Sequence, residues 1–202
     1  MTKTELILRI IELIFSLMGL VFIVLGWFIL YQQSLKTENL RKENDIKTEK
    51  IRWKKEFIDR QIADLYGPIS SLIREANIEF ALIQFQLGRS YIIPKNHTFK
   101  DLPENEKKIW IHYVDTYKIP MQLKIAEILR EGTHLMYNGE IPACVNTFLD
   151  YTLGWALLDN QKRNGVENYY EYYYSYNYPK SFDDYISNTL HLLYEERTKL
   201  IE

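Results

Sequence analysis

Cysteine is almost absent from this chain of 202 residues, because Cys144 is its only example. A single cysteine cannot form a disulfide within the chain, which suits a reducing compartment, although a cysteine-poor secreted protein would have the same composition. Strand-like alternation with hairpin turns is also lacking, except for a short stretch near residues 91–93, and there is no internal repeat. The sequence therefore predicts a fold built from helices rather than from a β-sheet.

An excess of positive charge is missing as well. The chain has 25 lysines and arginines against 27 aspartates and glutamates, which gives a formal net charge of −2 and an isoelectric point near 6.1. Domains dedicated to nucleic acid are normally basic overall, so this balance argues against nucleic acid as a partner. Hydrophobic residues make up 47% of the chain and charged residues 26%, which is the range of ordinary globular proteins.

The sequence contains none of the short motifs that carry common enzyme chemistry. Glycine-rich phosphate loops, the G-x-S-x-G nucleophile turn, the H-E-x-x-H zinc motif and C-x-x-C pairs do not occur. Cys144 has small or apolar neighbours typical of core packing, and no adjacent residue would lower its thiol pKa. We therefore predict that the protein is not an enzyme and uses no cofactor.

One spacing matches part of a metal site. Glu131 and His134 fit the Glu-x-x-His element of di-iron helix bundles, which need two such elements and two further glutamates. Only one element occurs here, and Gly132 lies inside it, so we predict no metal. The alternative function is an enzyme whose site is assembled from scattered acids and histidines: Glu131, His134, His112, Asp115, Glu75 and Glu79.

What the sequence does contain is a long uncharged segment near its N-terminus. Residues 13–35 include no charged side chain, and their apolar part, residues 13–31, would span roughly 28 Å as a helix, about the thickness of a bilayer's hydrocarbon core. Tryptophan and tyrosine near one end favour the headgroup level. Residues 1–35 are therefore predicted to form a short tail and a transmembrane helix, with anchor residues Leu13, Phe22, Trp27 and Tyr31.

The distribution of basic residues predicts how this helix is oriented. Lys3 and Arg9 precede the segment and are offset by Glu5 and Glu12, whereas the stretch that follows is rich in lysine and arginine. Basic residues are retained on the cytoplasmic side of a membrane. We therefore predict a single-pass protein whose N-terminus lies outside and whose C-terminal part is cytoplasmic.

Residues 36–55 are charged and contain no glycine or proline, which predicts a solvated helical stem. Glu38 and Lys42 have the spacing and order of a favourable ion pair on one helix face. A coiled-coil register through residues 40–65 alternates apolar with polar residues, so it permits a weak dimer without requiring one. A homo-oligomer therefore remains open at this point.

Residues 56–202 are predicted to form a compact all-α bundle of about five helices in the cytoplasm. Apolar residues recur at three- and four-residue steps from Ile58 to Leu87, and Gly67-Pro68 interrupts this stripe, which predicts a kink there. Beyond the kink, a second set of apolar residues predicts a central helix buried on more than one side, and this set comprises Ile78, Leu82 and Phe85.

The rest of the bundle is divided by prolines and glycines. A helix is expected from about residue 102 until Pro120 breaks it, with Asp101 and Glu104 as a capping box. The next covers about residues 121–131 and ends at Gly132, and another starts with Pro142 in its first turn and runs to about residue 162. A last helix follows a cap at Ser181.

The most unusual feature is a tyrosine-rich segment, residues 169–178. The rings do not alternate strictly, so one strand or helix face cannot bury them all. One interpretation is a connector whose rings lie on the helix surface, and the other is a recognition surface for a protein partner. The residues of this partner-binding hypothesis are Tyr169, Tyr170, Tyr172, Tyr173, Tyr174, Tyr176 and Tyr178.

Three short elements resemble a loosely defined family of uncharacterised bacterial proteins of about 200 residues with an N-terminal anchor and a helical remainder. They are residues 65–69 (LYGPI), residues 139–142 (GEIP) before a helix holding Phe148 and Trp155, and Tyr178-Pro179 with Phe182 before the final helix. The resemblance implies bacterial origin and this domain layout, and it supplies no catalytic residue. With a bacterial origin, the membrane of the predicted anchor is the inner membrane. Some bacterial proteins of this layout lie beside phage-defence genes.

Together these observations predict a non-enzymatic interaction or regulatory module on the cytoplasmic face of a bacterial membrane. Its expected partners are the lipid bilayer and a protein that the sequence does not identify. A phage-defence membrane effector or sensor is a special case, and an effector that damages membranes would have to oligomerise because one transmembrane helix forms no pore. The alternative, from another functional class, is a membrane-bound enzyme with the scattered acids and histidines named above.

Overall fold

The computed structural model describes the backbone of residues 3–90, 99–167 and 178–200 and, within these ranges, the side chains from Ser16 onward except those of Leu17, Leu20 and Val24. The protein is 90% helical and contains no strand in this part of the chain, which confirms the all-α prediction. The chain divides into two compact units, Met1–Trp53 and Lys54–Glu202.

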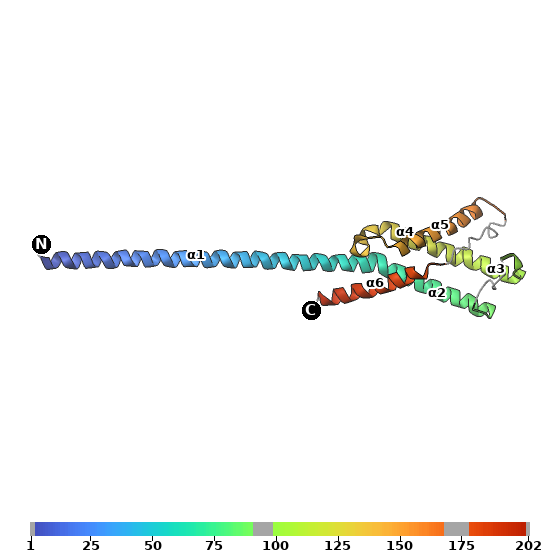
Figure 1. Ribbon diagram of the computed structural model, residues 1–202, viewed down its shortest axis with the longest axis horizontal. Coiled ribbons are helices and arrows are strands. Elements are labelled where there is room, and N and C mark those ends of the chain that lie inside the picture. The colour runs from blue at the N-terminus through green and yellow to red at the C-terminus, as the bar shows by residue number, and fades with distance from the viewer. Residues whose placement is uncertain (1–2, 91–98, 168–177, 201–202) are drawn as a thin grey trace. The chain divides into compact units, whose positions relative to one another are not determined.

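The first unit is built from a single helix. Helix α1 runs without interruption over Lys3–Arg60, and its last turns belong to the second unit (Figure 1). The stem predicted for residues 36–55 is therefore helical, and Lys42 pairs with Glu38 at 2.7 Å. Among the described residues, no helix meets the length and apolarity needed to cross a membrane. The side chain of Leu13 lies outside these residues.

The predicted interruption at Gly67-Pro68 takes the form of a π-helical turn. Residues Gln61–Tyr66 form this turn, α2 covers Gly67–Leu87, and the Gly67 amide donates to the carbonyl of Ile62, five residues back. Proline lacks a backbone N–H and its ring crowds the preceding turn, so a widened turn accommodates it while the chain stays helical. The chain changes direction between the end of α1 and α2 (Figure 1).

Pro120 is accommodated in the same way, so the predicted break there is wrong. Helix α3 (Glu104–Tyr113) passes through a π-helical turn (Val114–Lys118) directly into α4 (Ile119–Glu131), and Pro120 is the second residue of α4. The amide of Ile119 again bonds five residues back, to Val114. At both junctions, before α2 and before α4, the helix start contains a proline and is preceded by a π turn rather than by a loop.

The remaining helices are α5 (Ala143–Arg163) and α6 (Lys180–Lys199), and short 3₁₀ turns cover Phe99–Asp101, Thr133–Leu135 and Tyr137–Gly139. Two predicted caps differ from the structure. Pro103 rather than Asp101 precedes the first turn of α3, and Pro179 precedes α6, so Ser181 lies inside the helix. Neither helix start has a side-chain capping hydrogen bond.

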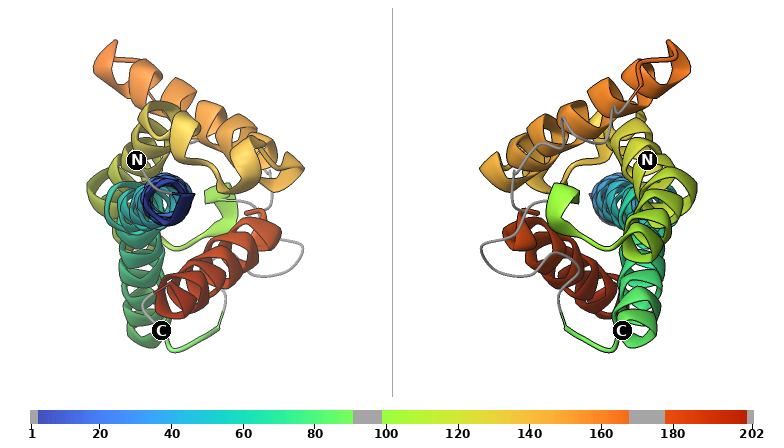
Figure 2. Two further views of the ribbon diagram at one scale, coloured as in Figure 1. Left: turned by 90° about the vertical axis from the view of Figure 1, so that its left-hand side faces the viewer. Right: turned by 90° about the vertical axis from the view of Figure 1, so that its right-hand side faces the viewer.

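Helices α2, α4, α5 and α6 of the second unit surround a shared interior (Figure 2). Phe148 of α5 stacks on Phe182 of α6 with ring centres 4.1 Å apart, and both side chains are fully buried. Around them lie Leu65 and Ile69 from the π turn and α2, and Ile125 from α4. A second cluster of aromatic and aliphatic residues joins α3 to the far half of α5.

Tyr66 fastens the first π turn to this interior. Its side chain is fully buried, and its hydroxyl accepts the backbone N–H of Tyr137 at 2.9 Å and bonds the hydroxyl of Tyr185 at 2.8 Å. Burial, followed by the bond to Tyr185, raises the pKa of the Tyr66 hydroxyl. A neutral hydroxyl with these hydrogen bonds thus holds the first π turn, the 3₁₀ turn Tyr137–Gly139 and α6 in register.

Candidate functional site

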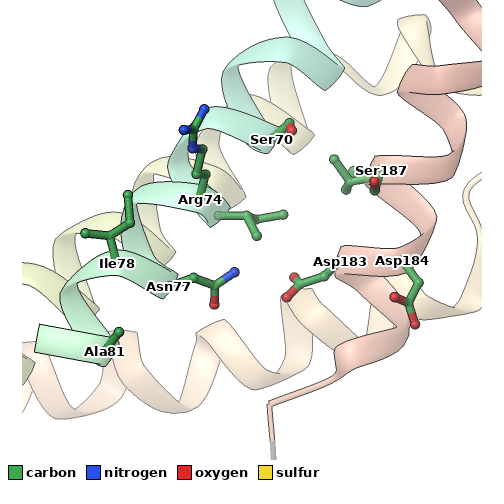
Figure 3. Close-up of a pocket in the computed structure, with 10 residues that line it drawn as sticks. Ser70, Arg74, Asn77, Ile78, Ala81, Asp183, Asp184 and Ser187 are labelled. Atoms are coloured by element: carbon green, nitrogen blue, oxygen red, sulfur yellow. The ribbon is translucent and has the colours of Figure 1, made fainter. Parts of the chain in front are cut away.

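A groove of about 480 Å³ lies between α2 and α6 (Figure 3). The α2 wall carries Ser70, Arg74, Asn77, Ile78 and Ala81, the α6 wall carries Asp183, Asp184 and Ser187, and Ile73 and Ile186 complete the lining. These polar residues come from two helices that are far apart in the sequence. The groove is the first place to look for a function because polar and apolar groups meet in it.

The buried face of each helix determines which residues line the groove. On α2, Ile69 is fully buried, and residues 72, 73 and 76 also pack against the interior. Residues 70, 74, 77 and 81 have the three- and four-residue spacing of the adjacent face. On α6, burial of Phe182 and Ile186 similarly directs Asp183 to the groove. The site is thus a by-product of the packing that forms the core.

The two walls of the groove carry opposite charges. Asp183 is half-buried, and burial raises its pKa, to which the neighbouring Asp184 adds while a bond from the Tyr178 hydroxyl opposes the rise. In Figure 3 the Asn77 amide and the Asp183 carboxylate point toward one another, and the Arg74 guanidinium points away from both aspartates. Neither Arg74 nor Asp184 forms an ion pair with any of the described residues.

Next to the groove, α2 exposes an apolar stripe, defined here as Ile78, Leu82 and Phe85. Their side chains are 52%, 55% and 87% exposed, respectively. The sequence predicted that these residues would be buried on a second face of a central helix, and this prediction is wrong. Helix α2 packs against α3, α4 and α6, and these helices cover the opposite face, to which Leu72 and Ile83 belong.

Of the tyrosine-rich segment, residues 169–178, the structure describes only Tyr178. Tyr169, Tyr170, Tyr172, Tyr173, Tyr174 and Tyr176 lie outside the described residues. Tyr178 is described, and it packs inward rather than forming a surface. Its ring meets Tyr151 edge-on at 5.5 Å and Phe148 at 6.2 Å, and its hydroxyl donates to Asp183. Burial raises the pKa of this hydroxyl.

Four of the six acids and histidines considered for an enzyme, Glu131, His134, His112 and Asp115, form the following contacts. His134 lies 3.3 Å from Arg60 and 3.1 Å from the Glu131 carbonyl, whereas Asp115 pairs with Lys162 at 2.8 Å. His112 contacts Thr116 within its own helical segment. The groove lining includes none of the six candidates. No group of three or more histidines, cysteines or acids in the described part of the chain could hold a metal.

Sequence reasoning missed Lys118, the last residue of the second π turn. Its ammonium nitrogen lies 4.2 Å from the centre of the Trp155 ring and 5.4 Å from that of Trp110. Burial lowers the pKa of this amine to about 8. No local pattern marks such a lysine, because its aromatic neighbours come from two other helices.

The predicted anchor residues that are described have exposed side chains. Trp27 is 76% exposed, and Phe22 and Tyr31 are exposed to a similar degree.

Comparison of the chain with protein-family models, with curated proteins and with solved structures finds no match.

Proposed function

We propose that the protein is a membrane-anchored interaction module whose helical unit binds a protein partner at the cytoplasmic face of a bacterial membrane. The observation that carries this proposal is the apolar stripe of α2. A helix that is apolar on two faces normally buries both, yet Ile78, Leu82 and Phe85 face solvent. Three apolar side chains at i, i+4 and i+7 are the anchor pattern by which one helix binds another.

The energetic argument follows from the size of these side chains. Fully burying a leucine, isoleucine or phenylalanine stabilises a complex by about 1.5–3 kcal/mol relative to leaving it in water. Isolated exposed apolar residues are ordinary, but a contiguous patch usually marks an interaction surface. Adjacent turns of one helix make the three residues contiguous, so a partner that covers them gains from all three at once.

The anchor is supported by the sequence of α1. Residues 13–35 carry no charge, and the described side chains of Phe22, Trp27 and Tyr31 are exposed, which suits contact with lipid better than contact with water. The basic residues after position 35 support a cytoplasmic C-terminal unit. Carbonate extraction of native membranes should leave the full chain in the pellet and release a variant that lacks residues 1–35.

A fusion experiment tests the orientation. Alkaline phosphatase attached to the C-terminus should be inactive and a cytoplasmic reporter at the same position active, because the basic stretch holds that side in the cytoplasm. Active alkaline phosphatase from this fusion would reverse the proposed topology.

Photo-cross-linking tests the interaction surface. A photoreactive residue at Phe85 of the full chain in its native host should yield a discrete cross-linked protein. The same residue at Glu127, an exposed position on α4, should not yield that product. The Leu82→Ser variant should lose the product while its melting temperature is unchanged. Identical products at positions 85 and 127 would rule out a specific surface at α2.

A further inference from the structure

The α2–α6 groove and the apolar stripe form one continuous surface. Ile78 belongs to both, since it lines the groove and is the first residue of the stripe, and Leu82 follows one turn along α2. An elongated partner could therefore lie along α2 and contact both features at once.

The acidic and basic residues of the groove lie on different helices. Asp183 and Asp184 lie on the α6 side, and Arg74 lies on the α2 side. The two aspartates are adjacent in the chain, and their mutual repulsion contributes to the raised pKa of Asp183. A positive group placed beside them would relieve this repulsion, and a negative group would face Arg74 on the other wall.

The openness of the groove distinguishes a helix from a small molecule. Small-molecule sites bury most of the ligand surface. Here Arg74, Asn77, Ile78, Asp184 and Ser187 are all exposed, so the groove encloses nothing on its outer side. A helix resting along α2 needs no such enclosure, because its own far face remains in solvent.

We propose that the groove and the apolar stripe together bind an amphipathic helix of a protein partner that presents basic residues to Asp183 and Asp184. Three apolar side chains of that helix cover Ile78, Leu82 and Phe85, and its basic flank faces α6. Any acidic flank faces Arg74, which fixes the direction in which the helix is turned about its axis. The inference rests on the proposed function, to which it adds the chemistry of the partner.

Two designed peptides serve as probes. Both are labelled, alanine-based helical peptides with leucines at i, i+4 and i+7. One carries lysines along one flank, and its matched counterpart carries glutamates at the same positions. Fluorescence anisotropy measures their binding to the full chain in lipid nanodiscs. The lysine peptide should bind about fivefold to tenfold more tightly at low salt, and this preference should shrink in 0.5 M NaCl, because salt screens exposed charges.

Variants of the protein assign each contribution. Asp184→Asn removes an exposed charge and should reduce the preference for the lysine peptide to less than about twofold. Leu82→Ser should weaken both peptides by about fivefold or more, since it removes an apolar anchor. The matched controls are Glu127→Gln, an exposed acid on α4, and Leu192→Ser, an exposed leucine on α6, and neither should change binding.

Asp183→Asn provides a second test of the acidic wall. Because Asp183 accepts a hydrogen bond from the Tyr178 hydroxyl, the melting temperature of the Asp183→Asn variant is measured first. If this variant is destabilised, the test of the acidic wall relies on Asp184→Asn alone. The inference is overturned if the two peptides bind the parent protein equally tightly. It is also overturned if the lysine peptide binds Leu82→Ser as tightly as it binds the parent protein. If the peptides show no preference while Phe85 still cross-links a discrete protein in cells, the helix chemistry is wrong and the proposed function survives. If Phe85 gives no specific product, the proposed function itself fails.

Discussion

The ammonium group of Lys118 lies between two tryptophan rings, 4.2 Å from the centre of Trp155 and 5.4 Å from the centre of Trp110. Ring faces attract a cation, but burial withdraws the amine from water, and burial is the cause of its lowered pKa. The π turn that accommodates Pro120 is also the turn that ends at Lys118. The proline thus indirectly positions a lysine whose pKa is lowered by burial.

The first prediction concerns stability against pH. The Lys118 pKa is about 8 in the fold and about 10.5 in the unfolded chain, so between these values the unfolded chain binds more protons. The free energy of unfolding should therefore rise as pH increases from 7 to 9.5, by at most about 2 kcal/mol. Denaturant unfolding of the full chain in mild detergent measures this rise.

Lys118→Met is the matched control, because it keeps the apolar stem and removes the titrating group. Its unfolding free energy should rise less over the same pH interval. The comparison stops below pH 10, because Tyr66 and Tyr178 both have raised pKa values. Their hydroxyls ionise in the unfolded chain first, so stability should fall above that pH. A parallel rise in the parent and in Lys118→Met would show that another group is responsible.

The second prediction concerns Gly67. A Cβ atom at this position would lie 2.5 Å from the backbone carbonyl oxygen of Ile62, so the π turn has no room for a side chain. Gly67→Ala should therefore lower the free energy of unfolding by about 1–3 kcal/mol, although alanine favours ordinary helices. Ser71→Ala, at an exposed position of α2, should change it by less than about 0.5 kcal/mol. A stabilised Gly67→Ala protein would contradict the π turn.

The two π turns, Gln61–Tyr66 and Val114–Lys118, illustrate how far the fold could be predicted from the sequence. The helical period, the glycines and the prolines predicted an all-α unit and most helix boundaries. They did not distinguish a break from a π turn, because Pro68 and Pro120 exclude the same hydrogen bond in either case. The choice depends on packing of the flanking turns, as for Tyr66, whose bonding partners Tyr137 and Tyr185 are remote in the sequence.

The candidate site was harder to predict for the same physical reason. The sequence identified Ile78, Leu82 and Phe85 as an apolar face, but exposure depends on which helices pack beside α2. The sequence pattern singled out neither Arg74 nor Asp183, since nothing local indicates that α6 returns to lie along α2. Local pattern therefore predicted the elements, and only their packing defined the groove.

The third prediction separates Tyr178 from the other tyrosines of its segment. Tyr178→Ser should lower the free energy of unfolding by about 2–4 kcal/mol, because the ring packs on Tyr151 and Phe148 and the hydroxyl bonds Asp183. Tyr173→Ser tests the surface hypothesis that the sequence suggests, and it should cost less than about 0.5 kcal/mol. Thermal unfolding of the two variants decides the matter. An equal loss in both would place Tyr173 in the core as well.

The last prediction tests which face of α2 is buried. Ile83 and Leu82 are neighbours in the same helix, yet Ile83 packs against the second aromatic cluster while Leu82 is 55% exposed. Ile83→Ser should therefore lower the free energy of unfolding by about 2–4 kcal/mol, since it removes packed apolar volume and buries a hydroxyl. Leu82→Ser should alter it by less than about 0.5 kcal/mol, because the serine hydroxyl stays in water.

Urea unfolding of the two single variants in the same detergent gives both numbers, and the adjacent positions keep helix propensity and local charge nearly matched. The sequence alone predicted burial at Leu82, so a loss at Leu82→Ser as large as at Ile83→Ser would restore that expectation. It would also remove the exposed stripe on which the proposed partner surface depends. A large loss at Ile83 alone leaves Leu82 free to contact a partner, because its side chain then contributes little to the stability of the protein by itself.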